Sequence, residues 1–129
     1  WPIHEQVMTS LGRAGVPVHT STVKFLHTGY TDPTRNRLKQ VRNREILLAQ
    51  IERRQQVTPM TFFLLGGCHL DLDEHEKALA CYREAHATAL AASDGEEIAR
   101  GSLVRIATCL VALGRHEDAI AEMPAMFDA

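Results

Sequence analysis

Several features on which enzymes and membrane proteins depend are missing from this 129-residue sequence. It has no glycine-rich loop for phosphate, no G-x-S-x-G nucleophile elbow and no cysteine-histidine framework for zinc. No apolar run approaches the roughly 18 residues of a membrane span, and no stretch has the pattern of a signal peptide. The formal net charge is −2, so no overall field attracts nucleic acid or an anionic membrane. We therefore expect no nucleic-acid partner and no membrane span.

Cysteine is also scarce, and the positions of the cysteines indicate the redox state of the cellular compartment. Cys68, Cys81 and Cys109 are odd in number and have no C-x-x-C spacing. They fall within helical apolar patterns, where a free cysteine behaves as a small hydrophobe. Free thiols suit a reducing compartment, so we predict a cytoplasmic protein. Because the chain begins with Trp1 rather than Met, we also expect it to be a piece of a longer polypeptide.

Residues 1–31 do not have a helical pattern throughout. Residues 3–11 and 16–27 are rich in Val, Thr, Ile and Phe, and residues 12–15 supply turn-forming glycines between them. We predict a short β-hairpin, although Val7, Met8 and Leu11 would also share one face of a helix. A two-stranded hairpin is marginal alone, so a following helix or another domain must cover it.

Residues 32–57 are predicted to form a long helix that links this segment to the rest. Asp32 can accept hydrogen bonds from the first amides, and Pro33 suits the first helical position because it has no N–H to satisfy. The helix should end near Gln56, since Thr58-Pro59 repeats the same start signal. Helical spacing also joins five residues into one apolar stripe: Leu38, Val41, Leu47, Leu48 and Ile51.

Residues 58–129 contain two similar units, at about 60–92 and 96–127. The first reads Phe62-x-x-Leu65-Gly66-x-x-His69, a corner at residues 72–74, then Ala78-x-x-x-Tyr82. The second reads Leu103-x-x-Ile106-Ala107-x-x-Leu110, a corner at Gly114, then Ala119-x-x-x-Met123. This spacing resembles the tetratricopeptide repeat (TPR), although Ala78 and Ala119 are 41 residues apart (119 − 78) instead of about 34. The resemblance implies a mainly α fold of TPR-like antiparallel helical hairpins, an α-α superhelix, after the β-hairpin.

The TPR resemblance also implies a protein-binding groove along the first helix of each hairpin. Its predicted residues are largely apolar and lack the Lys and Asn carboxylate clamp of some TPRs, so a free C-terminus is not the expected ligand. Pro124 disfavours continuation of the last helix, and the apolar edge left at this end favours a protein partner or a homo-oligomer. The predicted groove residues are Phe63, Gly67, Leu70, Val104, Thr108 and Val111.

Acidic and histidine residues gather at positions 69–75, where Asp71-Leu72-Asp73 imitates the D-x-D with which sugar-nucleotide transferases hold a divalent cation. We predict an ordinary helix corner instead, with Asp73 as an N-cap and Asp71 solvated, because no strand precedes them to place the carboxylates in a cleft. His86 and His116 have no ligand at i+3 or i+4 to complete a helical metal pair. No metal site is therefore expected in this chain.

The front of the chain carries a second resemblance. Ile3-His4-Glu5-Gln6, then His27-x-Gly29-Tyr30, then Lys39-x-x-Arg42-Asn43-x-x-Ile46-Leu47-Leu48 lead into the TPR-like part. This order resembles the end of a bacterial family 2 glycosyltransferase, in which a nucleotide-sugar domain closes with I-H-E and H-x-G-Y segments. In some members of that family a K-x-x-R-N helix and TPRs follow.

The glycosyltransferase resemblance implies roles for four residues in an intact parent enzyme. His4 and Glu5 would match the segment that closes over the donor and acceptor site, the imidazole on the diphosphate or its metal and the carboxylate on the acceptor hydroxyl. His27 and Tyr30 would lie at the substrate side or fasten a strand end to the next helix. The parent's cofactors would be a nucleotide-sugar donor and a divalent cation, Mg or Mn, held by a missing N-terminal catalytic domain.

Two functions therefore stand side by side. In one, the chain is the TPR-containing C-terminal part of a glycosyltransferase and docks the acceptor or another subunit. In the other, it is a stand-alone TPR module for protein-protein interaction. In neither does the chain itself hold a complete catalytic site.

Overall fold

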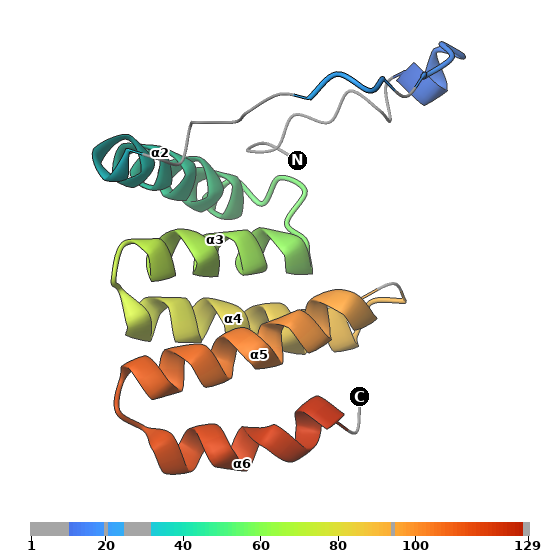
Figure 1. Cartoon of the computed structure of the whole chain (residues 1–129). Helices are drawn as coiled ribbons and strands as arrows, with labels where there is room; N and C mark the ends of the chain where they lie inside the picture. The colour runs from blue at the N-terminus through green and yellow to red at the C-terminus, as the bar shows by residue number, and fades with distance from the viewer. Residues whose placement is uncertain (1–10, 20, 25–31, 94, 128–129) are drawn as a thin grey trace.

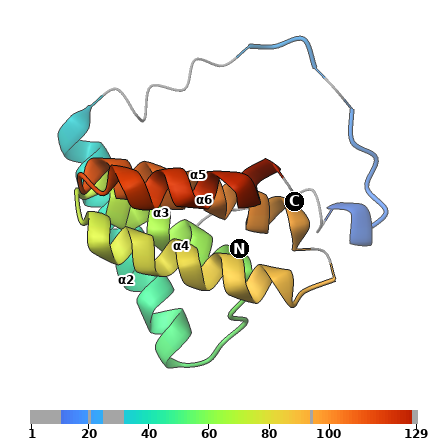
Figure 2. The same ribbon diagram turned by 90° about the horizontal axis from the view of Figure 1, so that it is seen from below.

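The computed structural model describes residues 11–19, 21–24, 32–93 and 95–127, with the side chains of 123–127 left aside. The described chain is mainly helical and contains no strand. Each helix packs antiparallel against its neighbour along the chain, and α3 also contacts α5 (Figure 1). Seen from below, α2 crosses the stack at an angle to the others (Figure 2). The helices are α2 Pro33–Glu52, α3 Pro59–Asp71, α4 His75–Leu90, α5 Glu96–Ala112 and α6 His116–Phe127.

Both predicted proline-led helix starts are confirmed. Oδ1 of Asp32 accepts hydrogen bonds from the amides of Thr34 and Arg35, at 2.9 and 3.3 Å, and Pro33 follows at the first helical position. At α3, the backbone N–H of Thr58 donates to Oγ1 of Thr61, at 3.1 Å. These contacts satisfy amides that have no partner within the helix, which is why short polar residues begin helices.

The helix α2 ends at Glu52, four residues before the predicted end at Gln56 (56 − 52). Arg54 and Gln56 have positive φ angles, of 52° and 49°, which a continuing helix does not allow. The side-chain amide of Gln50 donates to the carbonyl of Gln56 at 2.8 Å and fastens this bend to the end of the helix.

The corners of the two helical hairpins share one backbone arrangement. The N–H of Glu74 donates to the carbonyl of His69 at 2.9 Å, and the N–H of Arg115 donates to the carbonyl of Leu110 at 2.8 Å. The residue before each donor is left-handed: Asp73 has a φ of 63° and Gly114 a φ of 72°. The hairpins therefore repeat with a 41-residue offset (110 − 69), the offset that the sequence pattern predicts.

The predicted role of Asp73 as an N-cap is wrong, because the N-cap of α4 is Glu74. Asp73 instead occupies the left-handed position that turns the chain, a conformation that aspartate tolerates better than most residues. Although proline disfavours helix continuation, α6 runs through Pro124 to Phe127, where the second unit was expected to end.

The predicted β-hairpin is not confirmed. Residues 11–13 form a single helical turn, and 16–19 and 21–24 have no regular secondary structure. The remainder of the predicted hairpin lies outside the described residues. Val16, Val18 and Val23 are exposed, so nothing in the described structure covers the apolar face that a strand here would need to bury.

The core lies between the helices along the length of the stack. One cluster joins α4, α5 and α6 around Tyr82 and Leu110. A second joins α2 to α3, where Leu47 is fully buried against Leu65 and Cys68. The ring of Tyr82 packs directly against Gly66, so α3 and α4 approach closely at this glycine. The linking helix α2 is thus part of the packed array.

Candidate docking groove

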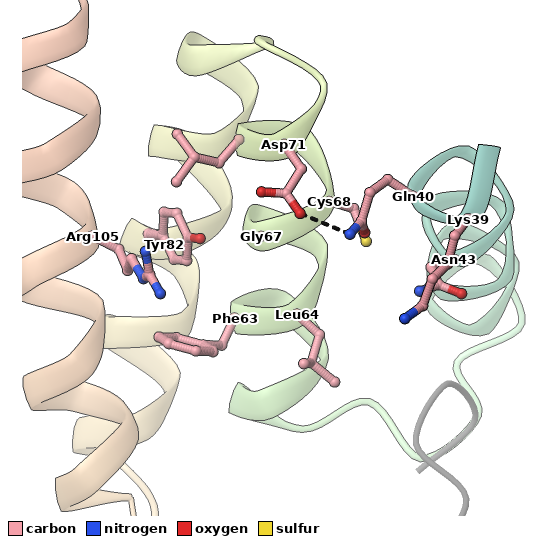
Figure 3. Close-up of a pocket in the computed structure, with 11 residues that line it drawn as sticks. Lys39, Gln40, Asn43, Phe63, Leu64, Gly67, Cys68, Asp71, Tyr82 and Arg105 are labelled. Atoms are coloured by element: carbon pink, nitrogen blue, oxygen red, sulfur yellow. Dashed lines mark hydrogen bonds between the residues drawn. The ribbon is translucent and has the colours of Figure 1, made fainter. Parts of the chain in front are cut away.

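A pocket of about 220 Å³ opens across α3, with α2 on one side and α4 and α5 on the other (Figure 3). Its floor is largely apolar, and polar side chains stand on both walls. It is lined by Lys39, Gln40 and Asn43 from α2, by Phe63, Leu64, Gly67, Cys68, Leu70 and Asp71 from α3, by Tyr82 from α4 and by Arg105 from α5.

The floor contains the half of the predicted groove that belongs to α3. Phe63, Gly67 and Leu70 all line the pocket, as expected from their side of the helix. Phe63 packs edge-on against Tyr82, with ring centroids 5.5 Å apart and an interplanar angle of 68°. Gly67 keeps the floor open: a Cβ atom added there would meet only the hydroxyl of Tyr82, at 3.8 Å. A larger side chain at this position would occupy part of the pocket.

The other half of the predicted groove lies elsewhere on α5. Val104 is 49% exposed and Val111 is 53% exposed, and neither lines the pocket. Thr108 is also exposed, and its hydroxyl donates to the carbonyl of Val104 at 2.9 Å. From α5 the pocket instead receives Arg105, the neighbour of Val104 along the chain.

The wall contributed by α2 was missed by the prediction of a groove. Nε2 of Gln40 donates to Oδ2 of Asp71 at 2.7 Å and bridges α2 to the end of α3. Asn43 is only 5% exposed, and its Oδ1 accepts a hydrogen bond from Arg42 at 3.4 Å. The available signal was the i, i+4 spacing of Lys39 and Asn43, which puts both on one side of a helix.

A network around Glu74 holds the α2 wall against the corner of the first hairpin. Its Oε2 contacts Nη1 of Arg44 at 3.0 Å and Nδ1 of the buried His69 at 2.6 Å. Its Oε1 accepts from Nζ of Lys77 at 2.9 Å. The hydrogen bonds from Lys77, His69 and Arg44 lower the pKa of Glu74 to about 2. The carboxylate therefore stays charged and joins α2, α3 and the first turn of α4 at one point.

The pocket offers no reactive thiol. Cys68 lines it, but burial, with a smaller effect from Asp71, raises the pKa of this thiol to about 11. Burial also raises the pKa of the Cys81 thiol to about 11 and that of Cys109 above its ordinary value. A thiol that stays protonated at neutral pH is a poor nucleophile, so these cysteines serve packing.

The predicted catalytic and substrate residues His4, Glu5, His27 and Tyr30 lie outside the described residues. In the part of the chain that the structure does describe, no group of three or more His, Cys, Asp or Glu side chains is placed to hold a metal ion. Among those same residues, no helix has both the length and the apolar character needed to cross a membrane. Comparisons with known protein families, with curated proteins and with solved structures found no match to this chain.

Proposed function

We propose that this chain is a docking module in which α2 and a pair of TPR-like helical hairpins hold an extended segment of another polypeptide. The observation that carries the proposal is the pocket across α3, with Gly67 on its floor and walls from α2, α4 and α5. Helices packed on both sides keep these walls in place, so binding does not require the site to be ordered first. The shared corner of the two hairpins supports the TPR-like assignment.

We further propose that the module is the C-terminal part of a glycosyltransferase that takes sugar from a nucleotide donor. The support is the order of the motifs at His4-Glu5, His27-x-Gly29-Tyr30 and Lys39-x-x-Arg42-Asn43 before the helical array. In this assignment the chemistry belongs to an upstream catalytic domain with its divalent cation. The groove then docks the acceptor or another subunit.

The docking function is tested by blocking the pocket. Gly67→Leu would place a side chain over the floor, while Ala87→Leu adds a comparable side chain at an exposed position of α4 away from the pocket. Both variants and the parent chain are screened against arrays of blocked peptides, after circular dichroism confirms that they fold. We expect peptides that bind the parent and Ala87→Leu chains and lose binding to Gly67→Leu. Equal binding to all three chains would refute docking in this pocket.

The coding sequence upstream of this chain distinguishes a part of a glycosyltransferase from a stand-alone module. If a longer chain that includes the upstream residues transfers or hydrolyses sugar from a nucleotide donor, the enzyme assignment stands. If the upstream coding sequence contains no α/β domain with a D-x-D strand, the stand-alone interaction module is the remaining assignment. Light scattering of the purified chain then decides whether a second copy of the chain is the partner.

A further inference from the structure

Hydrogen-bond donors at the pocket lack acceptors among the described residues. Tyr82 is 1% exposed and Asn43 is 5% exposed, and neither the Tyr82 hydroxyl nor Nδ2 of Asn43 has an acceptor within the described chain. The guanidinium of Arg105 likewise has no ion pair there. Burial raises the pKa of the Tyr82 phenol, so it remains a donor at neutral pH. Tyr82, Asn43 and Arg105 all line the pocket, so a bound molecule that carries acceptor groups can pair with these donors there.

Three charged side chains line the pocket: Lys39 on the α2 wall, Asp71 at the end of α3 and Arg105 on α5. Figure 3 places Arg105 beside Tyr82 on one side of α3, whereas Asp71 lies at the end of α3 nearest to Gln40. The carboxylate of Asp71 repels another acid at its own end, and the cation of Arg105 attracts one at the other. An anionic group is therefore favoured at Arg105 and disfavoured at Asp71.

The apolar part of the floor limits what carries that anion. Phe63, Leu64 and Leu70 line the pocket next to these polar groups, and they favour a ligand with hydrocarbon beside its acid. A glutamate or aspartate within a polypeptide has this combination: a carboxylate for Arg105, a backbone carbonyl for an amide donor and apolar neighbours for the floor.

We propose that the pocket binds an internal acidic side chain of a partner polypeptide, with its carboxylate held by Arg105 and Tyr82 and a neighbouring backbone carbonyl held by Asn43. This inference rests on the proposed docking function and names its ligand. Guanidinium and carboxylate match in geometry and charge, and the resulting hydrogen bonds are about twice as strong as neutral ones. Recognition is of an acidic residue inside a segment and does not need a free C-terminus.

The test uses the full 129-residue chain and two matched sets of nonapeptides. All peptides are acetylated and amidated, with a central Glu between apolar residues in one set and a central Gln in the other. Binding is measured by fluorescence anisotropy at low and high salt. The variants are Arg105→Gln, which removes the cation, and Tyr82→Phe, which removes only the hydroxyl. Arg100→Gln is the control: it removes a cation from the same helix that pairs with Glu96 on the surface at 2.6 Å.

We expect the Glu peptides to bind more tightly than the Gln peptides, with a preference that weakens as salt rises. Arg105→Gln should reduce affinity for the Glu peptides roughly tenfold to hundredfold, the range for hydrogen bonds to charged groups. Tyr82→Phe should lower it by about threefold to tenfold, and Arg100→Gln should leave it unchanged.

Each contrary outcome has a distinct meaning. Equal affinity for Glu and Gln peptides, with binding lost in Gly67→Leu, would overturn the acidic ligand and leave the docking function standing. Absence of binding by either set, together with a blank array, would overturn both. Displacement of the Glu peptides by millimolar inorganic phosphate at constant ionic strength would assign a small-anion site instead and overturn the polypeptide ligand.

Discussion

Gly66→Ala should destabilise the protein although alanine is the better helix former. A Cβ atom added at Gly66 would lie 2.8 Å from Cε1 of Tyr82, 2.9 Å from its Cδ1 and 3.0 Å from its Cζ. These distances are too short for carbon atoms in contact, so the ring must move. The ring has little room for this, because it is 1% exposed and packs edge-on against Phe63.

The neighbouring glycine supplies a matched control for the size of this effect. Gly67 lies in the same helix, and a Cβ atom there has an ordinary contact of 3.8 Å with the Tyr82 hydroxyl. Replacing a helical glycine by alanine stabilises by about 1 kcal/mol, which Gly67→Ala should show in full. Overpacking a core costs about 1–3 kcal/mol, so Gly66→Ala should come out roughly 0–2 kcal/mol less stable than the parent. The difference between the two variants isolates the close packing.

Urea denaturation followed by circular dichroism at 222 nm measures both variants. We expect the Gly67→Ala midpoint to lie above the parent's and the Gly66→Ala midpoint to lie at or below it, with unchanged m values. Combining Gly66→Ala with Tyr82→Leu removes the ring, and in that background alanine should become favourable at position 66. Equal stability of Gly66→Ala and Gly67→Ala would refute the argument, because it would mean that Tyr82 yields without cost.

Further predictions concern the corners and the attachment of α2. Glu74→Gln should lower the urea midpoint near pH 7. Because the folded pKa of Glu74 is depressed to about 2, the stability that its carboxylate contributes is complete above about pH 4.5 and is lost as the pH falls toward 2. The midpoints of parent and variant should therefore converge in acid. Asp73→Gly should raise stability by up to about 1 kcal/mol and Gly114→Ala should lower it by about 1 kcal/mol, since both positions have left-handed backbone. Leu47→Ala should cost about 2–5 kcal/mol in the same unfolding transition, whereas Leu48→Ala, at a 45% exposed position, should cost far less. Three results would contradict the structure. They are equal midpoints of the parent and Glu74→Gln at neutral pH, stability changes at Asp73 and Gly114 opposite in sign to those expected, and equal losses of stability in Leu47→Ala and Leu48→Ala.

Local chemistry made the helix boundaries readable from the sequence. Asp32-Pro33 and Thr58-Pro59 marked two starts correctly, because capping involves amides only two or three residues away. The end of α2 was placed too late, since positive φ at Arg54 and Gln56 has no signature in residue type. The proline at position 124 disfavours continuation but does not end α6, which runs through it to Phe127.

Only the part of the candidate groove that comes from α3 could be predicted from the sequence. Phe63, Gly67 and Leu70 share a side of α3, and helical periodicity alone puts them together. Lys39 and Arg105 are distant from them in sequence, and only the packing of α2 and α5 brings them to the same pocket. The predicted groove was accordingly more apolar than the observed one.

The sequence by itself determined the mainly helical class, most helix boundaries and the 41-residue offset between the hairpins. Periodicity, caps and corner residues act over one or two turns of chain, so their effects are visible without knowledge of the fold. The tertiary structure alone decided that α2 joins the array, that its polar residues form a wall, and that Tyr82, Asn43 and Arg105 meet at one pocket without acceptors among the described residues. These features depend on the angle and depth at which helices meet, and those are set by the packing of all their side chains together.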